Sequence, residues 1–137
     1  MNDLLVWNDE WNTGIPEVDE MHLAMAHKLN QVFELFRECY ECELDHRLRS
    51  ALGEFLELTR EHFGLEEEKM RLCNYPDYAN HKKEHIMLVG ELVQYIRELE
   101  QRRAALDATT QSNLKSWLIA HIVIADKAFA NYYHTVD

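Results

Sequence analysis

Residues that can bind a metal ion interrupt the apolar faces of four predicted helices. His62 and Glu66 lie four residues apart, as do His81 and His85, so each pair sits about one turn apart on a single helix face. The other two helices each contribute one inward histidine. The inward-facing set is His22, His62, Glu66, His81, His85 and His121. Imidazole and carboxylate groups are ligands for iron, zinc, copper or manganese, so the pattern points to metal binding.

Asp126 is a further candidate whose position does not follow from helical periodicity. It comes five residues after His121, which places it about 140° round an ideal α-helix from that side chain. A long reach across the helix, or a local π-type widening of the backbone, would turn it inward. The spacing alone leaves open whether Asp126 joins the set or faces elsewhere.

Apolar residues at helical spacing predict the four helices that position these side chains. The first is expected from about Asp19, a candidate N-cap, to Tyr40, and the second from about Asp45, also a candidate cap, to Leu72. The third carries the second histidine pair near its start, and the fourth starts near Thr109. The inward stripes are predicted to contain Met25, Leu29, Val32, Phe33 and Phe36, then Leu48, Leu52, Phe55 and Leu58, then Leu88, Leu92, Tyr95 and Leu99, and finally Leu114, Trp117, Leu118, Ile124, Phe129 and Tyr132.

Four such helices with short connections predict an all-α fold, an up-down-up-down antiparallel four-helix bundle with an N-terminal arm. The arm, residues 1–18, contains Trp7 and Trp11 and is expected to lie across the bundle formed by residues 19–137. Residues 1–137 are expected to form a single domain. In an antiparallel bundle the start of the first helix, the end of the second and the start of the third share one end. The candidates on these three helices should therefore meet there, with His121 nearer the middle of the fourth.

Burying so many polar side chains is costly unless something satisfies them. An unpaired buried polar group costs about 1–3 kcal/mol, and coordination to a metal removes that penalty. A lone histidine on an apolar stripe is ordinarily explained by burial with a hydrogen-bond partner, whereas five histidines converging from four helices favour a metal. More than four or five ligands exceed what one tetrahedral zinc ion needs, so two metal ions are expected.

Composition and charge disfavour several other classes of protein. The 137 residues carry a formal net charge of −11, which is unsuited to binding nucleic acid. The apolar stretches are much shorter than the roughly 20 residues that span a membrane, and no secretory signal is recognisable. We therefore expect a cytoplasmic protein without a membrane partner, and the acidic surface favours a monomer. Cys39 and Cys42 lack a second C-x-x-C pair, so we interpret them as incidental thiols.

The ordered set of motifs resembles the hemerythrin family, in particular its single-domain bacterial members. The resemblance covers nearly the whole chain. It rests on Trp7 and Trp11, Val18-Asp19-Glu20-Met21-His22, His62-Phe63-Gly64-Leu65-Glu66-Glu67, His81-Lys82-Lys83-Glu84-His85, and Trp117-Leu118-Ile119-Ala120-His121-Ile122-Val123-Ile124-Ala125-Asp126. One departure is Met21, where the family usually has Gln.

The resemblance implies a non-haem centre of two iron ions joined by an oxo or hydroxo bridge, in a protein that binds dioxygen reversibly as a carrier, store or delivery protein and is not an enzyme. By similarity, His81, His85 and His121 would bind one iron. His22 and His62 would bind the other, which keeps an open position, and Glu66 and Asp126 would bridge both. Trp117, Leu118 and Ile119 resemble the wall of the oxygen pocket, with Ile124 as a further candidate for which plain core packing is an equal explanation. The remaining histidines, His27, His46 and His134, are expected at the surface or at helix ends.

Two alternatives remain. The same domain can be an oxygen-sensing or redox-sensing part of a larger signalling protein; a chain that ends at Asp137 without an output domain favours the stand-alone carrier. Residues 81–85 also match the H-x-x-E-H pattern of inverted zinc peptidases, in which Glu84 would be the general base. That interpretation leaves three inward histidines on other helices unexplained.

Overall fold

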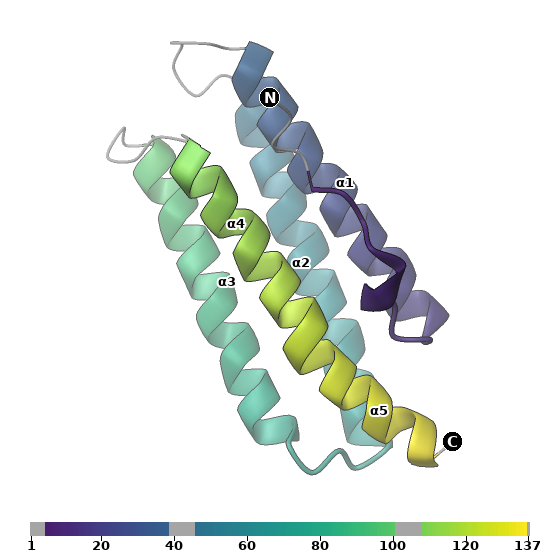
Figure 1. Cartoon of the computed structure of the whole chain (residues 1–137). Coiled ribbons are helices and arrows are strands. Elements are labelled where there is room, and N and C mark those ends of the chain that lie inside the picture. The colour runs from purple at the N-terminus through teal and green to yellow at the C-terminus, as the bar shows by residue number, and fades with distance from the viewer. Residues whose placement is uncertain (1–4, 39–45, 101–107, 137) are drawn as a thin grey trace.

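The computed structural model describes residues 5–38, 46–100 and 108–136, and all regular structure in this part of the chain is helical. The elements are η1 (Asp9–Trp11), α1 (Pro16–Glu38), α2 (His46–Leu72), α3 (Tyr78–Glu100), α4 (Ala108–Ala120), η2 (His121–Asp126) and α5 (Lys127–Val136). Figure 1 shows α4 and α5 joined into one continuous rod, so that four long helical rods lie side by side as predicted. The cap predicted at Asp45, the helix end predicted at Tyr40, and both Cys39 and Cys42 lie outside the described residues.

The connection between α2 and α3 reverses the chain within a few residues. Asn74 adopts a left-handed conformation with φ 55°, and the backbone N–H of Tyr75 donates to the carbonyl of Met70 at 2.9 Å. This pairing, together with the bond from Asn74 N–H to the Arg71 carbonyl at 3.3 Å, ends the helix in a Schellman motif. Pro76 follows and prevents the helix from continuing. The end of α2 and the start of α3 are thereby placed at the same end of the bundle.

The first long helix begins three residues before the predicted position. Pro16 is its first residue, where a missing N–H is tolerated, and the Ile15 carbonyl accepts the first helical hydrogen bond, from Asp19 N–H at 3.0 Å. Asp19 is therefore not the N-cap that the sequence suggested. Its carboxylate instead reaches back out of the first turn and accepts hydrogen bonds from the backbone N–H groups of Thr13, at 2.7 Å, and Gly14, at 3.1 Å. The side chain fixes the end of the arm to the helix.

The fourth rod contains the π-helical segment η2, bounded by the two residues His121 and Asp126. The wider turn accommodates one extra residue, which brings both ends of the segment to the inward face, where both side chains are buried. The same change of register turns Ile124 outward, and its side chain is 71% exposed. The prediction that Ile124 lies on the inward stripe is therefore wrong. Ile124 is also excluded as part of a pocket wall.

The apolar core is divided into two clusters. The larger contains Met25, Leu29, Leu52, Phe55 and Leu118 among its members, and the smaller consists of Ile15, Val18, Met70, Phe129 and Ala130. Most of the predicted inward stripe is buried or partly buried; the side chains of Phe36 and Leu99 lie outside the described set. The predicted metal-binding residues fall between the two clusters along α1, α2 and α3, and on the fourth rod His121 and Asp126 flank Ile122 of the larger cluster.

The N-terminal arm lies along α1 from residue 5 onward, as Figure 1 shows. Asn30 holds it by two hydrogen bonds, accepting from Leu5 N–H at 2.7 Å and donating to the Leu5 carbonyl at 2.8 Å. Trp7 and Trp11 pack edge to face at 5.3 Å. Within the described residues, none of the helices has both the length and the hydropathy needed to cross a lipid bilayer.

Candidate metal centre

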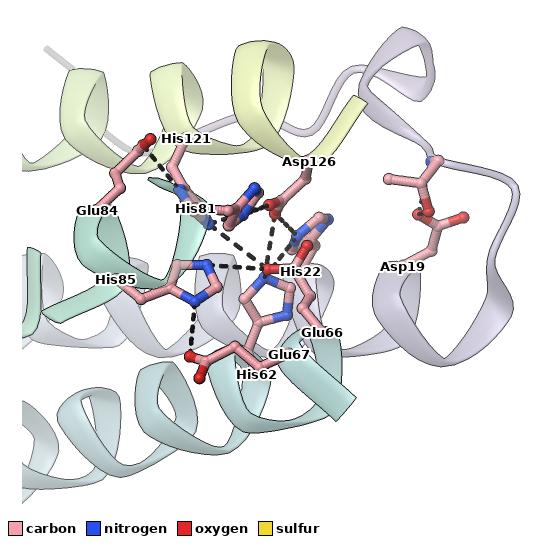
Figure 2. Close-up of polar contacts among 11 residues, drawn as sticks. Asp19, His22, His62, Glu66, Glu67, His81, Glu84, His85, His121 and Asp126 are labelled. Atoms are coloured by element: carbon pink, nitrogen blue, oxygen red, sulfur yellow. Dashed lines mark hydrogen bonds and ion pairs between the residues drawn. The ribbon is translucent and has the colours of Figure 1, made fainter. Parts of the chain in front are cut away.

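All seven candidate ligands predicted from the sequence meet in one buried layer, which we call the metal cluster. It consists of His22, His62, Glu66, His81, His85, His121 and Asp126, and each of these residues is buried. Figure 2 shows the imidazoles turned toward the carboxylates of Glu66 and Asp126 from all four rods. The antiparallel arrangement supplies this convergence, because α1 and α3 begin, and α2 ends, at the same end of the bundle.

Asp126 lies between two groups of histidines. Its Oδ2 atom is 2.7 Å from His22 Nε2 and 3.1 Å from His62 Nε2. Its Oδ1 atom is 3.1 Å from His121 Nε2 and 3.4 Å from His81 Nε2. Each oxygen of one carboxylate therefore faces a different group, which is the arrangement required to bridge two ions.

Glu66 also contacts histidines of both groups. Its Oε1 atom lies 3.0 Å from His62 Nε2, 3.5 Å from His85 Nε2 and 3.6 Å from His121 Nε2. The potential ligand atoms form two sets within which all atoms are within 4.8 Å of one another. One set is Glu66, His81, His85, His121 and Asp126, the three-histidine half; the other is His22, His62 and Asp126, the two-histidine half.

Burial and charge interactions shift the pKa values of the metal-free cluster in opposite directions, and the charge interactions together outweigh burial. Burial by itself would lower the pKa of His62, but the buried carboxylates of Glu66 and Asp126 raise it to about 9. The pKa of His121 is likewise raised despite its burial, mainly by Asp126. Burial would raise the pKa of Asp126, yet His121 and the hydrogen bonds from His22 and His62 hold it well below its usual range. Metal ions would replace these protons, so their binding must release protons.

Several buried atoms in the cluster are close together without making hydrogen bonds. Atoms that lack a partner of suitable geometry include both oxygens of Glu66, Oδ1 of Asp126, and Nε2 of His81, His85 and His121. Their 3.1–3.6 Å separations are those of ion pairs, but the atoms are not aligned for donation. Groups oriented in this way fit metal ions placed among them. The nitrogen and oxygen donor set suits iron, manganese or zinc.

The comparison with known families agrees with this geometry. The family described as Hemerythrin HHE cation binding domain matches residues 13–132. The chain belongs to the hemerythrin family. A bacteriohemerythrin from Stenotrophomonas maltophilia (strain R551-3) is 30% identical over 132 residues, which cover 93% of this chain and 80% of the relative. A myohemerythrin from Sipunculus nudus is 29% identical over 124 residues, which cover 90% and 89% of the two chains.

Among solved structures, a crystal structure of a mutant hemerythrin superposes with a TM-score of 0.83 and covers 95% of this chain and 97% of its own. The sequence identity is 22%, so this likeness concerns the fold. It agrees with the predicted all-helical bundle and N-terminal arm.

Two carboxylates outside the cluster contact its imidazoles on the side away from the centre. Glu67 Oε2 accepts a hydrogen bond from His85 Nδ1 at 2.9 Å, and Glu84 Oε1 lies 3.4 Å from His121 Nδ1 (Figure 2). The sequence interpretation assigned no role to Glu67 and considered Glu84 only as a peptidase base. The contact of Glu84 with His121 is one that the peptidase interpretation does not account for. Neither contact has a sequence signal, since the partners are 18 and 37 residues apart.

The predicted pocket residues of this hemerythrin-family chain lie in or against the apolar core, and the described histidines outside the cluster lie at the surface. Leu118 is fully buried, and Trp117 and Ile119 are partly buried and pack against the larger apolar cluster. Met21, at the family's usual Gln position, is half-buried. His27 is exposed, as expected, and His134 lies on α5, where its Nε2 donates to the Thr13 carbonyl at 2.8 Å. The side chain of His46 lies outside the described set.

Proposed function

We propose that this chain binds dioxygen reversibly at a non-haem di-iron centre and acts as an oxygen carrier or store. The observation that supports the proposal most directly is the buried metal cluster, in which two groups of histidines share the carboxylate of Asp126. Membership of the hemerythrin family makes iron the metal of choice. The relatives named above are bacteriohemerythrins and myohemerythrins.

In this proposal the three-histidine half holds one iron and the two-histidine half holds the other. Glu66 and Asp126 contact both groups and would bridge the ions. The two-histidine half offers fewer protein ligands and so leaves room for an exogenous molecule. Bound iron would supply the electrons that reversible dioxygen binding requires.

The residues around the cluster have the properties needed to keep such a reaction reversible. Reversibility would require that protons and water be kept from the site, because dioxygen that took two electrons from iron and then two protons would leave as hydrogen peroxide. Leu118 precedes His121 by three residues and Ile122 follows it directly. Both side chains are fully buried and belong to the larger apolar cluster, which is proposed to keep water from that side of the metal cluster. Trp117 and Ile119 are proposed to extend this wall with Leu118. Trp7 of the arm, which also packs against the larger apolar cluster, has its ring centroid 6.2 Å from that of His22.

The test is to load the full chain anaerobically with ferrous iron, count iron per chain, and record visible spectra while oxygen is added and removed. Two irons per chain and an absorption band that appears with oxygen and disappears on its removal are expected. The matched control is His27→Ala, because His27 is an exposed histidine on α1 outside the cluster, and this variant should behave as the wild type. Irreversible oxidation without an oxygenated species, or a single bound ion, would overturn the proposal.

A further inference from the structure

The two halves of the metal cluster differ in what lies behind their imidazoles. A histidine that binds a metal through Nε2 must carry its proton on Nδ1, and a carboxylate behind Nδ1 fixes that tautomer and makes Nε2 a stronger donor. In the described structure this support is found for two imidazoles of the three-histidine half, those of His85 and His121, and for neither imidazole of the two-histidine half.

His85 is held on two sides. Its Nδ1 donates to Glu67 Oε2 at 2.9 Å, and its ring lies parallel to that of Phe63, with ring centroids 3.8 Å apart and an interplanar angle of 4°. Its Nε2 then has no hydrogen-bond partner and is 3.5 Å from Glu66 Oε1. The ring is therefore oriented for a ligand before any ion binds.

His121 has a similar but longer contact. Glu84 Oε1 lies 3.4 Å from Nδ1, while Nε2 faces Asp126 at 3.1 Å. The Glu84 side chain is 43% exposed and that of Glu67 is 21% exposed. The Glu67–His85 contact is the shorter and less exposed of the two, so we expect it to have the larger effect.

The other half lacks such support. Nδ1 of His22 and Nδ1 of His62 are both buried, and neither has a hydrogen-bond partner among the described residues. Their Nε2 atoms are 3.0 Å apart and compete for the same oxygen of Asp126. Before an ion binds, these two imidazoles are thus oriented through their Nε2 atoms alone, by each other, by Asp126 and, for His62, by Glu66 at 3.0 Å.

We propose that Glu67 and Glu84 are positioning residues that make the three-histidine half the tighter of two metal positions, so that it binds the first divalent ion and releases it last. The inference rests on the metal centre of the proposed function and adds an order of occupancy. The larger number of imidazoles, three against two, favours the same order. Removal of an outer partner of a metal-binding histidine typically weakens binding about 10- to 100-fold.

The test is a titration of the metal-free full chain with Zn²⁺, followed by calorimetry and by ¹⁵N NMR of the imidazoles. The first equivalent should shift the signals of His81, His85 and His121, and the second those of His22 and His62. Glu67→Gln should weaken the first step about 10- to 100-fold and alter the tautomer signature of His85, with little change in the second step. Glu84→Gln should have a smaller effect in the same direction.

Glu68→Gln is the matched control, since Glu68 is the exposed neighbour of Glu67 and its substitution removes the same charge from the same helix. The inference is overturned if the first ion shifts the His22 and His62 signals, or if Glu67→Gln weakens binding no more than Glu68→Gln. Zn²⁺ release from the doubly loaded chain to excess chelator gives a second measurement that needs no folded metal-free state. Simultaneous release from both positions, or earlier release from the three-histidine half, would equally contradict the inference.

These outcomes are separable from those of the proposed function. The Zn²⁺ experiments involve no oxygen, so a reversed order of binding would leave oxygen binding by the iron-loaded chain untouched. Conversely, a chain that fails to oxygenate with iron can still fill its two positions in the inferred order.

Discussion

The apolar layer around Leu29, Leu52 and Phe55 and the metal cluster below it are both buried, yet they are completed in different ways. The apolar side chains need only shape complementarity, because burying them is favourable in itself. The polar side chains of the cluster lose their contacts with water, and several of their atoms gain no hydrogen bond in exchange. One layer is complete with the protein alone, whereas the other leaves buried polar atoms without hydrogen-bond partners.

Thr59 makes the contrast sharper, because it is a buried polar residue that needs no ligand. Its hydroxyl donates to the Phe55 carbonyl one turn earlier on α2, at 2.8 Å. His62 follows three residues later on the same helix, and its Nδ1 has no such partner. A hydroxyl can be satisfied by its own helix, but imidazoles gathered from four rods depend on partners from other rods, or on an ion between them.

The largest effect is expected from removing a ligand of the half with the fewest ligands. His62→Ala takes away one of the two imidazoles of the two-histidine half, and the stable oxygenated form should be lost completely. Visible spectra of the iron-loaded variant through oxygen cycles provide the measurement. An intact reversible band in His62→Ala would show that the open position has been assigned to the wrong half.

Metal removal should lower the stability of the folded chain through the metal cluster, while the packing of the apolar layer is unchanged. An ion present at about 1,000 times its Kd stabilises the folded state by about 4 kcal/mol, which corresponds to about 15 °C in Tm for a chain of this size. Thermal unfolding of the loaded chain, before and after chelation, tests this expectation. Equal Tm values for the two forms would mean that the cluster is satisfied without metal.

A truncation in the apolar layer should lower stability without changing the number of ions bound. Leu52→Ala removes a fully buried side chain and should lower the free energy of unfolding by about 2–5 kcal/mol, because it leaves a cavity. The variant should still bind two ions per chain when folded. Denaturant unfolding and metal analysis give the two readouts, and loss of metal without loss of stability would contradict the separation of the layers.

The smallest effect is expected at the boundary between the arm and the bundle. Asp19→Ala removes the acceptor for Thr13 and Gly14 and should cost about 1 kcal/mol, with local loosening of the arm. Glu17→Ala is a suitable control, since Glu17 is an exposed acidic residue of the same turn. Hydrogen exchange at residues 13–15 should increase in the first variant only; an equal increase in both would assign the effect to charge at the helix start.

The helices and most of the candidate ligands could be predicted from the sequence, because helical periodicity is a local property. The spacing of apolar residues indicated four rods, and the four-residue spacing of His62 with Glu66 and of His81 with His85 placed those pairs on inward faces. The exact start of α1 could not be predicted, because Asp19 has the right residue type for an N-cap but bonds to the arm instead. A cap and a reach-back contact look the same in sequence.

The sequence by itself determined most of the side chains that face the interior, though not Ile124 or Asp126, and, through their chemistry, that the interior must hold something other than hydrocarbon. Tertiary structure decided the rest. The π-helical turn brought Asp126 between the two groups of histidines and turned Ile124 outward, and packing of α2 against α3 placed Glu67 behind His85. Helical spacing is fixed within a few residues of chain, whereas the register of one turn and the contacts between rods depend on how all four pack together.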